Sequence, residues 1–330
     1  MWGTLGRGRA VRVAWRRAGG AFRLITPGDM LMKPWIAAVP ILLAATAAQA
    51  GSVSPYDHIF VIMEENHEYS QIIGNTNAPN INGYATTYGL ATNYDSVTHP
   101  SAPNYVALVG GSYFGIQDDN PWQTHKLNDP DLTSQIDTAG LAWKGYFQGL
   151  PHPGFTGNCY PSQCYYASKH NGPIYFDVVH KSKTELDKEV PITQLTKDIK
   201  KTLPNFAVIV PDQCHDMHGG YGDCANDTDA QLVAAGDTYA AGIVSQLTSA
   251  KFWTASNSAI VIVWDEGSTN VGGGGHVAAI VITSNGPRAL QDGTAYNHYG
   301  LLATIQDALG LGCLQNTCSA TPMAKLFAHK

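Results

Sequence analysis

Ser101 stands at a corner of the chain that could carry nucleophilic chemistry. It lies between Pro100 and Pro103 in the segment THPSAPNY (98–105), and the two prolines restrict the backbone torsions on both sides of it. Pro103 suits the first turn of a helix, so we expect Ser101 at a helix N-terminus, where free amides favour an anion such as phosphate. A serine hydroxyl near pH 7 needs a base or a metal ion to become a good nucleophile. A serine that merely caps a helix is the alternative.

Acidic and amide side chains follow three apolar segments that have the pattern of buried strands. The segments and their terminal polar residues are HIFVIMEEN (58–66) with Glu65 and Asn66, PNFAVIVPD (204–212) with Asp212, and SAIVIVWDEG (258–267) with Asp265 and Glu266. Carboxylates that emerge together at one sheet edge repel one another unless a positive charge lies between them. The sequence therefore predicts a divalent metal ion beside these acids, in contact with the Ser101 hydroxyl.

The elements that must position these residues alternate between strand and helix patterns. Further strand patterns cover 141–150 and 276–283, and apolar residues at helical spacing cover 104–111, 229–250 and 298–312. Such alternation predicts an α/β fold with a mostly parallel sheet, helices on both faces, and a ligand crevice outside the carboxyl ends of the strands. We expect one domain over residues 51–330.

The first fifty residues have the layout of an export signal. MLMKPWIAAVPILLAATAAQA (30–50) combines one lysine, an apolar core and terminal small residues, so we expect cleavage after Ala50. The arginine-rich stretch 1–29 is either a long n-region or the result of an upstream start codon, and Arg16–Arg17 leaves twin-arginine export as an alternative. We predict a secreted or periplasmic protein with no integral membrane segment once the signal is removed.

The charge of the mature chain argues against polyanionic partners. Residues 51–330 contain 13 Lys and Arg against 25 Asp and Glu, a formal charge of −12. Nucleic-acid and anionic-membrane binders need basic clusters, so we expect neither as a partner. No obligate protein partner is expected either.

The six cysteines lie in three close pairs within the predicted mature chain. The pairs are Cys159 with Cys164, Cys214 with Cys224, and Cys313 with Cys318. An even number of cysteines in an exported chain favours disulfides, although six cysteines allow fifteen connectivities. Zinc binding is the alternative, but the spacings lack a CxxC pair.

Five motifs in a fixed order carry a resemblance to a known family. They are IMEENH, THPSAPNY, PDQCHDMHGG, VWDEG and NHYGLLATIQDALG. Together they resemble the bacterial phosphoesterase family, which contains secreted acid phosphatases and phospholipases C and is similar in fold to alkaline phosphatase. The resemblance spans residues 56–327. It implies an alkaline-phosphatase-like three-layer sandwich.

The resemblance also implies a catalytic centre. Ser101 matches the nucleophile of the family, Glu65 and Asn66 match its first pair of metal ligands, and Asp265 and Glu266 match the second pair, where the family often has two aspartates. Oxygen ligands with one amide suggest Ca²⁺, Mg²⁺, Mn²⁺ or Zn²⁺.

Further residues are candidates for a second metal or phosphate site. The wider superfamily implies ligands in this region and one late histidine, and the candidates are Asp212, His215, Asp216, His218, His276 and His298. His215 and His218 could instead belong to a surface loop tied by Cys214 and Cys224.

His218 and four other side chains could assist catalysis. Asn120 is placed where related enzymes have an oxyanion-binding asparagine, and Lys169 with His170 could contact phosphate or protonate the leaving group. His99 could orient Ser101. A solvated turn for Lys169 and His170, and a structural cap for His99, are the alternatives.

These expectations converge on a secreted, metal-dependent phosphoric ester hydrolase. A phosphomonoesterase of the acid-phosphatase type, acting through a phosphoserine intermediate, is the leading hypothesis, and phosphoinositide monoesters are included among its substrates. A phospholipase C that cleaves lipid head-group diesters is one alternative. A non-catalytic exported protein that binds a metal or a glycan on the same scaffold is another.

Overall fold

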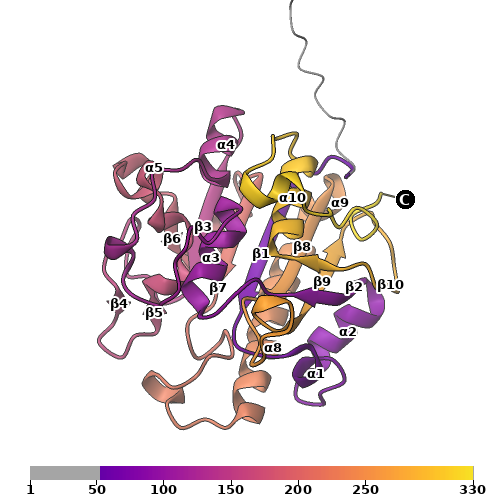
Figure 1. The fold of residues 1–330 in the computed structure, drawn as a ribbon. Helices are drawn as coiled ribbons and strands as arrows, with labels where there is room; N and C mark the ends of the chain where they lie inside the picture. Colours follow the sequence, from indigo (N-terminus) through magenta and orange to yellow (C-terminus); the bar gives the residue numbers. More distant parts are fainter. Residues whose placement is uncertain (1–52, 330) are drawn as a thin grey trace, which may run out of the picture. The chain divides into compact units, whose positions relative to one another are not determined.

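One mixed sheet forms the centre of the described part of the chain. The computed structural model describes residues 53–329, all within one unit, Gln49–Lys330 (Figure 1). In this part nine strands form one sheet in the order β10–β2–β9–β8–β1–β7–β3–β6, with β11 paired to β2, and β4–β5 is a separate hairpin. The strands are β1 His58–Glu64, β2 Gly89–Asp95, β3 Trp143–Phe147, β4 Cys159–Tyr160, β5 Tyr166–Ala167, β6 Glu189–Pro191, β7 Phe206–Val210, β8 Ser258–Trp264, β9 His276–Thr283, β10 Leu290–Asp292 and β11 Tyr296–Asn297.

Strand direction decides which chain segments gather at one edge of the sheet. β1 is parallel to β7 and β8, and β3 is parallel to β6 and β7. β9 is antiparallel to both β8 and β2. The carboxyl ends of β1, β2, β3, β7 and β8 therefore share one edge, and the N-terminal end of β9 lies at the same edge.

β1 and β8 form the buried middle of the sheet. Every residue of β8 is buried, and in β1 His58 alone is partly exposed. A strand that is covered on both faces has a continuous apolar run, as both segments do. The register pairs Glu64 with Trp264, so the two strands end at the same level.

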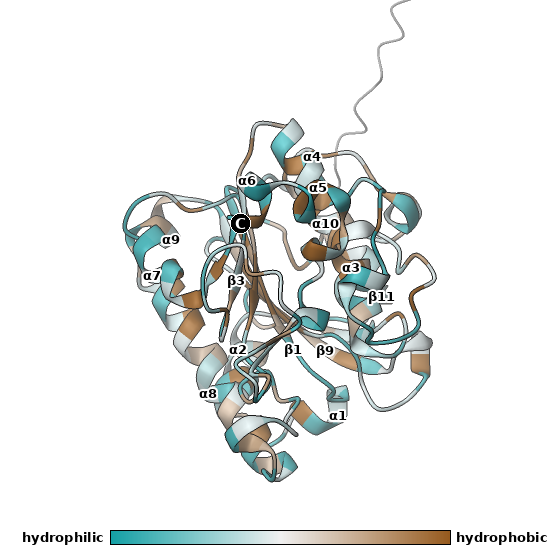
Figure 2. Cartoon of the chain, turned by 90° about the vertical axis from the view of Figure 1, so that its left-hand side faces the viewer, coloured by the Kyte–Doolittle hydropathy of each residue, from teal (hydrophilic) through white to brown (hydrophobic). Residues whose placement is uncertain are grey.

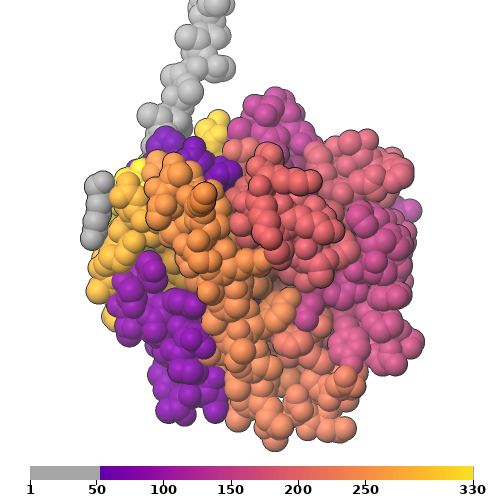
Figure 3. Space-filling view, turned by 180° about the vertical axis from the view of Figure 1, so that it is seen from behind, coloured from indigo at the N-terminus to yellow at the C-terminus, as the bar shows by residue number. Residues whose placement is uncertain are grey.

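Helices cover both faces of the sheet. Figure 2 shows α7, α8 and α9 on one side of the strands and α3, α5 and α10 on the other, and Figure 3 shows α8 crossing the middle of the first face. The helices are α1 Tyr69–Ile72, α2 Pro79–Thr87, α3 Ser101–Gly110, α4 Leu132–Thr138, α5 Asp177–His180, α6 Lys183–Leu186, α7 Leu195–Asp198, α8 Asp229–Thr248, α9 Lys251–Ala255 and α10 His298–Ala308. The predicted α/β sandwich with a mostly parallel sheet is confirmed.

The predicted elements are present with shifted ends, and six further strands, β2, β4, β5, β6, β10 and β11, are found in the described range. The helix expected over 104–111 begins at Ser101 and is α3, so Ser101 does lie at a helix N-terminus. β2 is not predicted by the sequence pattern, because GLATNYD mixes small and polar residues and lacks an apolar run. Its pairing with β9 forms only in the folded sheet.

The cysteines form the three local disulfides that their spacing suggests. Cys159 is bonded to Cys164, Cys214 to Cys224 and Cys313 to Cys318. The predicted signal segment, with cleavage after Ala50, lies outside the described residues. Within 53–329 no helix combines the length and the apolar character that a membrane span needs.

Candidate active site

The parallel pairing of β1 with β8 brings Glu65 and Asp265 together just beyond the strand ends. The Asp265 amide donates to the Glu64 carbonyl at 2.8 Å, and the Asn66 amide donates to the Asp265 Oδ1 at 3.2 Å. Asn66 has a φ of 56°, in the left-handed region, so the chain turns sharply away as soon as Glu65 is placed. Glu65 and Asp265 are fully buried.

Ser101 reaches these acids from the loop between β2 and α3. Asn104 fixes this loop: its Oδ1 accepts from the Ser96 hydroxyl at 2.9 Å, and its side-chain amide donates to the Thr98 carbonyl at 2.8 Å. The Ser101 hydroxyl then lies 3.1 Å from the Glu65 Oε2 and 3.5 Å from the Glu266 Oε1. The structure therefore brings Ser101 into contact with acids from both predicted pairs.

His99 holds Glu266 on the outer side of this cluster. Its Nδ1 lies 2.7 Å from the Glu266 Oε2 and its Nε2 lies 2.8 Å from the Thr269 carbonyl oxygen. Burial and the neighbouring Glu65 raise the pKa of Glu266, while His99 opposes this shift, and together these effects bring it to about 7. His99 thus orients a carboxylate that contacts Ser101.

The buried carboxylate of Asp265 has one oxygen without a partner among the described residues. This oxygen is Oδ2, which is buried and makes no hydrogen bond there. Burial raises the pKa of Asp265 well above its usual range, and the carboxylates of Glu65 and Glu266 raise it further. Several acids buried together are stabilised by a cation.

His170 packs between Glu65 and Asp216 on the inner side of the cluster. Its Nε2 lies 3.0 Å from the Glu65 Oε1 and its Nδ1 lies 3.3 Å from the Asp216 Oδ2. Neither the His170 Nε2 nor the Asp216 Oδ2 makes a hydrogen bond with the described residues. Burial lowers the pKa of His170 well below its usual range, as do the charges of Lys169 and His218. A neutral imidazole is the form that binds a metal ion.

One group of side chains in the described range has the spacing of a metal site. Ligand atoms of Glu65, His170 and His218 lie within 4.8 Å of one another. Carboxylate and imidazole donors suit a divalent transition metal. The orphaned oxygen of Asp265 and the close, unaligned pair of Glu65 and His170 both fit a cation in this region.

Lys169 supplies positive charge near the nucleophile. Its Nζ lies 3.0 Å from the Asp119 Oδ2 and 3.1 Å from the His218 Nε2. Burial lowers the pKa of Lys169, but the charges of Glu65 and Asp119 outweigh that effect and raise it. The Asp119 Oδ1 accepts from the Ala102 amide at 3.0 Å, so Asp119 links Lys169 to the first turn of α3.

The remaining predicted residues do not gather into one second site within the described range. Asp216 faces His170, whereas the Asp212 Oδ1 lies 2.6 Å from the His215 Nδ1, and the His215 ring packs at 4.9 Å from the Tyr239 ring on α8. Asp212 and His215 therefore lie toward the opposite face of the sheet from α3.

The two late histidines are engaged elsewhere. The His298 Nε2 lies 2.7 Å from the Asp265 carbonyl oxygen and its Nδ1 lies 3.0 Å from the Tyr94 hydroxyl. The His276 Nε2 lies 3.2 Å from the Thr92 carbonyl oxygen. Asn120 lies on an exposed turn, where its amide donates to Asp118, and its oxyanion role stays a prediction.

Sequence reasoning missed two side chains that shape the site. Tyr105 donates from its hydroxyl to the Glu65 Oε1 at 2.8 Å, and its ring stacks on His170 with centroids 5.0 Å apart. Its position four residues after Ser101 places it one turn along the same helix face, which is the signal that could have found it. Asp119 follows an irregular loop, and no local pattern predicts its contact with Ala102.

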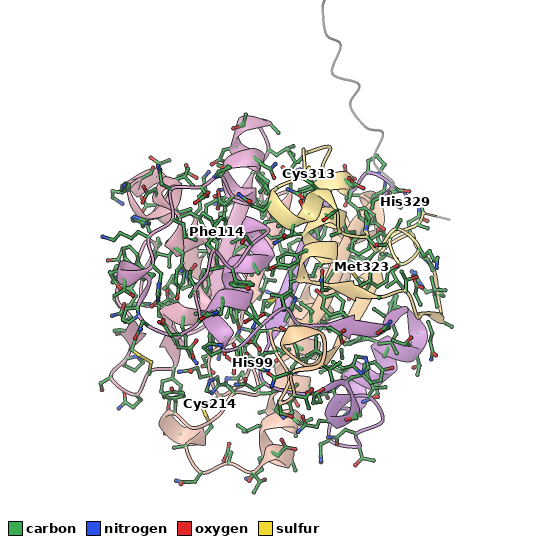
Figure 4. The ribbon with its side chains drawn as sticks, viewed as in Figure 1. His99, Phe114, Cys214, Cys313, Met323 and His329 are labelled. Carbon is green, nitrogen blue, oxygen red and sulfur yellow. A yellow bond between two sulfur atoms is a disulfide. The ribbon has the colours of Figure 1, made fainter. Side chains whose placement is uncertain are left out.

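The loops after β2 and β7 meet at the carboxyl edge of the sheet. Figure 4 labels His99 from the first loop and Cys214 from the second at the same end of the molecule. A buried nucleophile, clustered acids, imidazoles and one lysine thus lie together at this edge of the sheet, at the position where open α/β sheets bind ligands.

Comparisons with known proteins identify relatives that are named as phosphatases. Acid phosphatase from Aspergillus fumigatus is 28% identical over 307 residues, which cover 87% of this chain and 65% of that protein, so the chain spans less than two thirds of its length. Phosphatidylinositol-3-phosphatase from Mycobacterium tuberculosis is 28% identical over 300 residues, which cover 90% of each chain.

Solved structures share the fold. A protein in the alkaline phosphatase superfamily from Vibrio parahaemolyticus superposes with a TM-score of 0.57 at 10% identity, covering 82% of this chain and 72% of that one. The lipoteichoic acid synthase LtaP from Listeria monocytogenes gives a TM-score of 0.53 at 10% identity, covering 85% and 78%. The expected alkaline-phosphatase-like fold is therefore confirmed.

A sequence profile of one family matches residues 76–312, which contain Ser101, Asp265 and Glu266. The resemblance that the five motifs suggest is thus confirmed, and the chain belongs to the Phosphoesterase family.

Proposed function

We propose that the chain is an exported phosphoric ester hydrolase of the acid-phosphatase type, which releases phosphate from monoesters with Ser101 as its nucleophile. The observation that carries the proposal is the contact of the Ser101 hydroxyl with Glu65 at 3.1 Å, at the first residue of α3. The hydroxyl lies beside acceptors for its proton and beside a helix N-terminus that favours an anion.

The reaction proceeds in two displacements. The Ser101 oxygen attacks phosphorus, the bond from phosphorus to the leaving alcohol breaks, and a phosphoserine forms. Water then attacks the phosphoserine and releases inorganic phosphate. Glu65 and Glu266 are the acceptors within reach of the Ser101 proton.

A divalent cation fits the acids and imidazoles around Ser101. Glu65, His170 and His218 would hold it. The ligands predicted from the sequence are Glu65, Asn66, Asp265 and Glu266, so Glu65 is common to both sets. When bound, such an ion neutralises the clustered carboxylates and lowers the pKa of a coordinated hydroxyl group. Among the candidates, imidazole donors favour Zn²⁺ over Ca²⁺, Mg²⁺ and Mn²⁺.

Positive and amide groups around Ser101 would hold the transferring phosphoryl group. Lys169 is the nearby ammonium, His218 lies beside it, and Ser101 stands at the N-terminus of α3, whose Ala102 amide donates to Asp119. Preorganised donors of this kind stabilise charge that develops on phosphoryl oxygens. We assign no step to Asn120, which lies on an exposed turn.

The relatives support monoesters as substrates. Acid phosphatase and phosphatidylinositol-3-phosphatase are the names of two of them. The second relative covers 90% of both chains, which favours a phosphoinositide monoester as a second candidate substrate. Export is supported by three disulfides, which persist in oxidising compartments.

The experiment compares the purified protein with Ser101→Ala, using a chromogenic phosphomonoester and a phosphatidylinositol 3-phosphate. We expect Ser101→Ala to lose at least about 10³-fold in kcat at an unchanged melting temperature. Ser245→Ala, at an exposed position on α8, is the matched control and should keep wild-type activity. Full activity in Ser101→Ala would remove this serine from the reaction.

A further inference from the structure

Asp119 occupies the junction between the nucleophile and a neighbouring pocket. One of its carboxylate oxygens accepts from the Ala102 amide at 3.0 Å, and the other lies 3.0 Å from the Lys169 ammonium. Ala102 directly follows Ser101 in α3. A negative charge is thus fixed beside the place where a phosphoryl group would react.

The pocket beyond Asp119 has a volume of about 400 Å³, within the range of small-molecule sites. It lies against the β4–β5 hairpin and its disulfide. The lining, all of it within the described residues, contains one acid and one cation, Asp119 and Lys169, which pair with each other. The other polar lining residues are neutral: Asn158, Ser162, Gln163, Ser168, Gln213 and Tyr221.

We propose that this pocket is the leaving-group subsite and that it takes an uncharged, hydroxyl-bearing alcohol, with Asp119 as the residue that disfavours a leaving group carrying further phosphate. This inference rests on the proposed function and deepens it. Side-chain amides, hydroxyls and a carboxylate accept and donate hydrogen bonds to a polyol. The charge of Lys169 is already balanced by Asp119, so a second anionic group entering the pocket meets no free cation in its lining.

The neighbouring residue provides a matched control for the charge of Asp119. Asp118 is an acid of the same loop, but it lies 2.6 Å from the His125 Nε2 and is not part of the pocket lining. Asp119→Asn keeps an acceptor for the Ala102 amide and removes one negative charge. Asp118→Asn removes the same charge outside the pocket.

The test compares two esters that differ by one phosphate, fructose 6-phosphate and fructose 1,6-bisphosphate. In the wild-type protein we expect kcat/KM to favour the monophosphate, and in Asp119→Asn we expect that preference to fall by about fivefold or more, mainly through faster use of the bisphosphate. Asp118→Asn should keep the wild-type preference. The proposal would be overturned if Asp119→Asn and Asp118→Asn had the same ratio of kcat/KM for the two esters, or if the wild-type protein preferred the bisphosphate.

Binding to Ser101→Ala separates this inference from the proposed function. Calorimetric affinities of the two sugar phosphates should show the same preference in Ser101→Ala, and the preference should shrink in Ser101→Ala/Asp119→Asn. If the wild-type protein hydrolyses no ester, the proposed function fails, while the two affinities still decide whether Asp119 discriminates. If Ser101→Ala and Ser101→Ala/Asp119→Asn each bind the two sugar phosphates with equal affinity, the proposed subsite is wrong.

A last arm applies the same comparison to a lipid substrate. Free myo-inositol 1-phosphate is compared with phosphatidylinositol 3-phosphate in phosphatidylcholine vesicles, and the leaving group of that lipid carries an anionic phosphodiester. We expect the wild-type protein to favour the free monophosphate and Asp119→Asn to narrow that preference. A wild-type preference for the lipid would contradict the exclusion of a charged leaving group.

Discussion

The hydroxyl group of Ser101 lies 3.1 Å from one oxygen of Glu65, while the Tyr105 hydroxyl donates to the other oxygen at 2.8 Å. The carboxylate is therefore held from one side by α3 and presented to the first residue of the same helix. Because Glu65 also belongs to the group with His170 and His218, it is shared between the nucleophile and the proposed metal ligands.

Replacing Glu65 should abolish turnover without unfolding the chain. Glu65→Gln keeps the volume and removes the charge that Ser101 and the cation both face, so we expect kcat to fall by about 10²–10³-fold. Steady-state kinetics and a melting curve measure the two effects. Asp129→Asn removes an exposed charge and should match the wild-type protein, whereas near-normal kcat in Glu65→Gln would contradict the shared role.

Removal of the proposed metal ion should destabilise the protein as well as inactivate it. Without a cation, the buried acids Glu65 and Asp265 would face one another uncompensated, so a chelator should lower the melting temperature by several degrees. Re-addition of Zn²⁺, Mn²⁺, Ca²⁺ or Mg²⁺, one at a time, identifies the ion that restores both properties.

Asp265→Asn offers the control for the chelation experiment. It removes one buried charge, so the shift in melting temperature on chelation should be smaller than in the wild-type protein. A chelator that changes neither activity nor melting temperature in the wild-type protein would exclude a structural cation at this site.

Glu189, which does not contact Ser101, should make the stability of the protein depend on pH. It is fully buried in β6, one oxygen accepts from the Asn171 side chain at 2.9 Å, and burial raises its pKa from 4.5 to about 8. Between these values the native state binds one proton more than the unfolded state, so the free energy of unfolding falls as pH rises through this window.

Glu189→Gln should therefore lose that part of the pH dependence. At about pH 9 we expect the free energy of unfolding of the variant to exceed that of the wild-type protein by on the order of 3 kcal/mol, with little difference near pH 4.5. Urea denaturation across this pH range measures the free energy of unfolding of both proteins, with the metal concentration held constant. The exposed control Asp129→Asn should keep the wild-type slope, and the same slope in Glu189→Gln would refute the assignment.

The disulfide between Cys214 and Cys224 should matter more for catalysis than the disulfide between Cys313 and Cys318 near the C-terminus. It closes a loop that contains Asp216 and His218, with a sequence separation of 10. Cys214→Ser/Cys224→Ser should lower kcat/KM by about tenfold, because both side chains lose their fixed position.

The pair Cys313–Cys318 is the matched control for the disulfide prediction. It closes a loop with a separation of 5, and Figure 4 shows Cys313 at the opposite end of the molecule from His99. Its double serine variant should keep kcat/KM while losing some stability. Equal losses of kcat/KM in both double variants would indicate a general effect of unfolding.

The centre of the fold could be predicted because it is built from continuous apolar runs. β1, β7 and β8 are buried on both faces, so their segments have the pattern of core strands, and the polar residues directly after them mark the site edge. β2 lacks that pattern, and the direction of β9 depends on the finished sheet. Neither could be read from local sequence.

Residue spacing alone could not separate neighbouring candidates. Glu64 and Glu65 are adjacent, yet Glu65 contacts Ser101 while both oxygens of Glu64 are buried without a partner in the described range. His215 and His218 lie in one disulfide loop, yet only His218 approaches Lys169. Tertiary packing on the two faces of the sheet determines which of these neighbouring residues reaches the site.

The reversed direction of β9 has a consequence for how the crevice can vary. β8 leaves the sheet at the crevice and β9 re-enters at the same edge, so the connecting residues 265–275, with the Thr269 carbonyl beside His99, begin and end above the nucleophile. Insertions into this connection would enlarge the rim of the crevice while leaving both helical layers unchanged. Relatives with this topology could therefore acquire new substrate preferences by altering the length of a single hairpin.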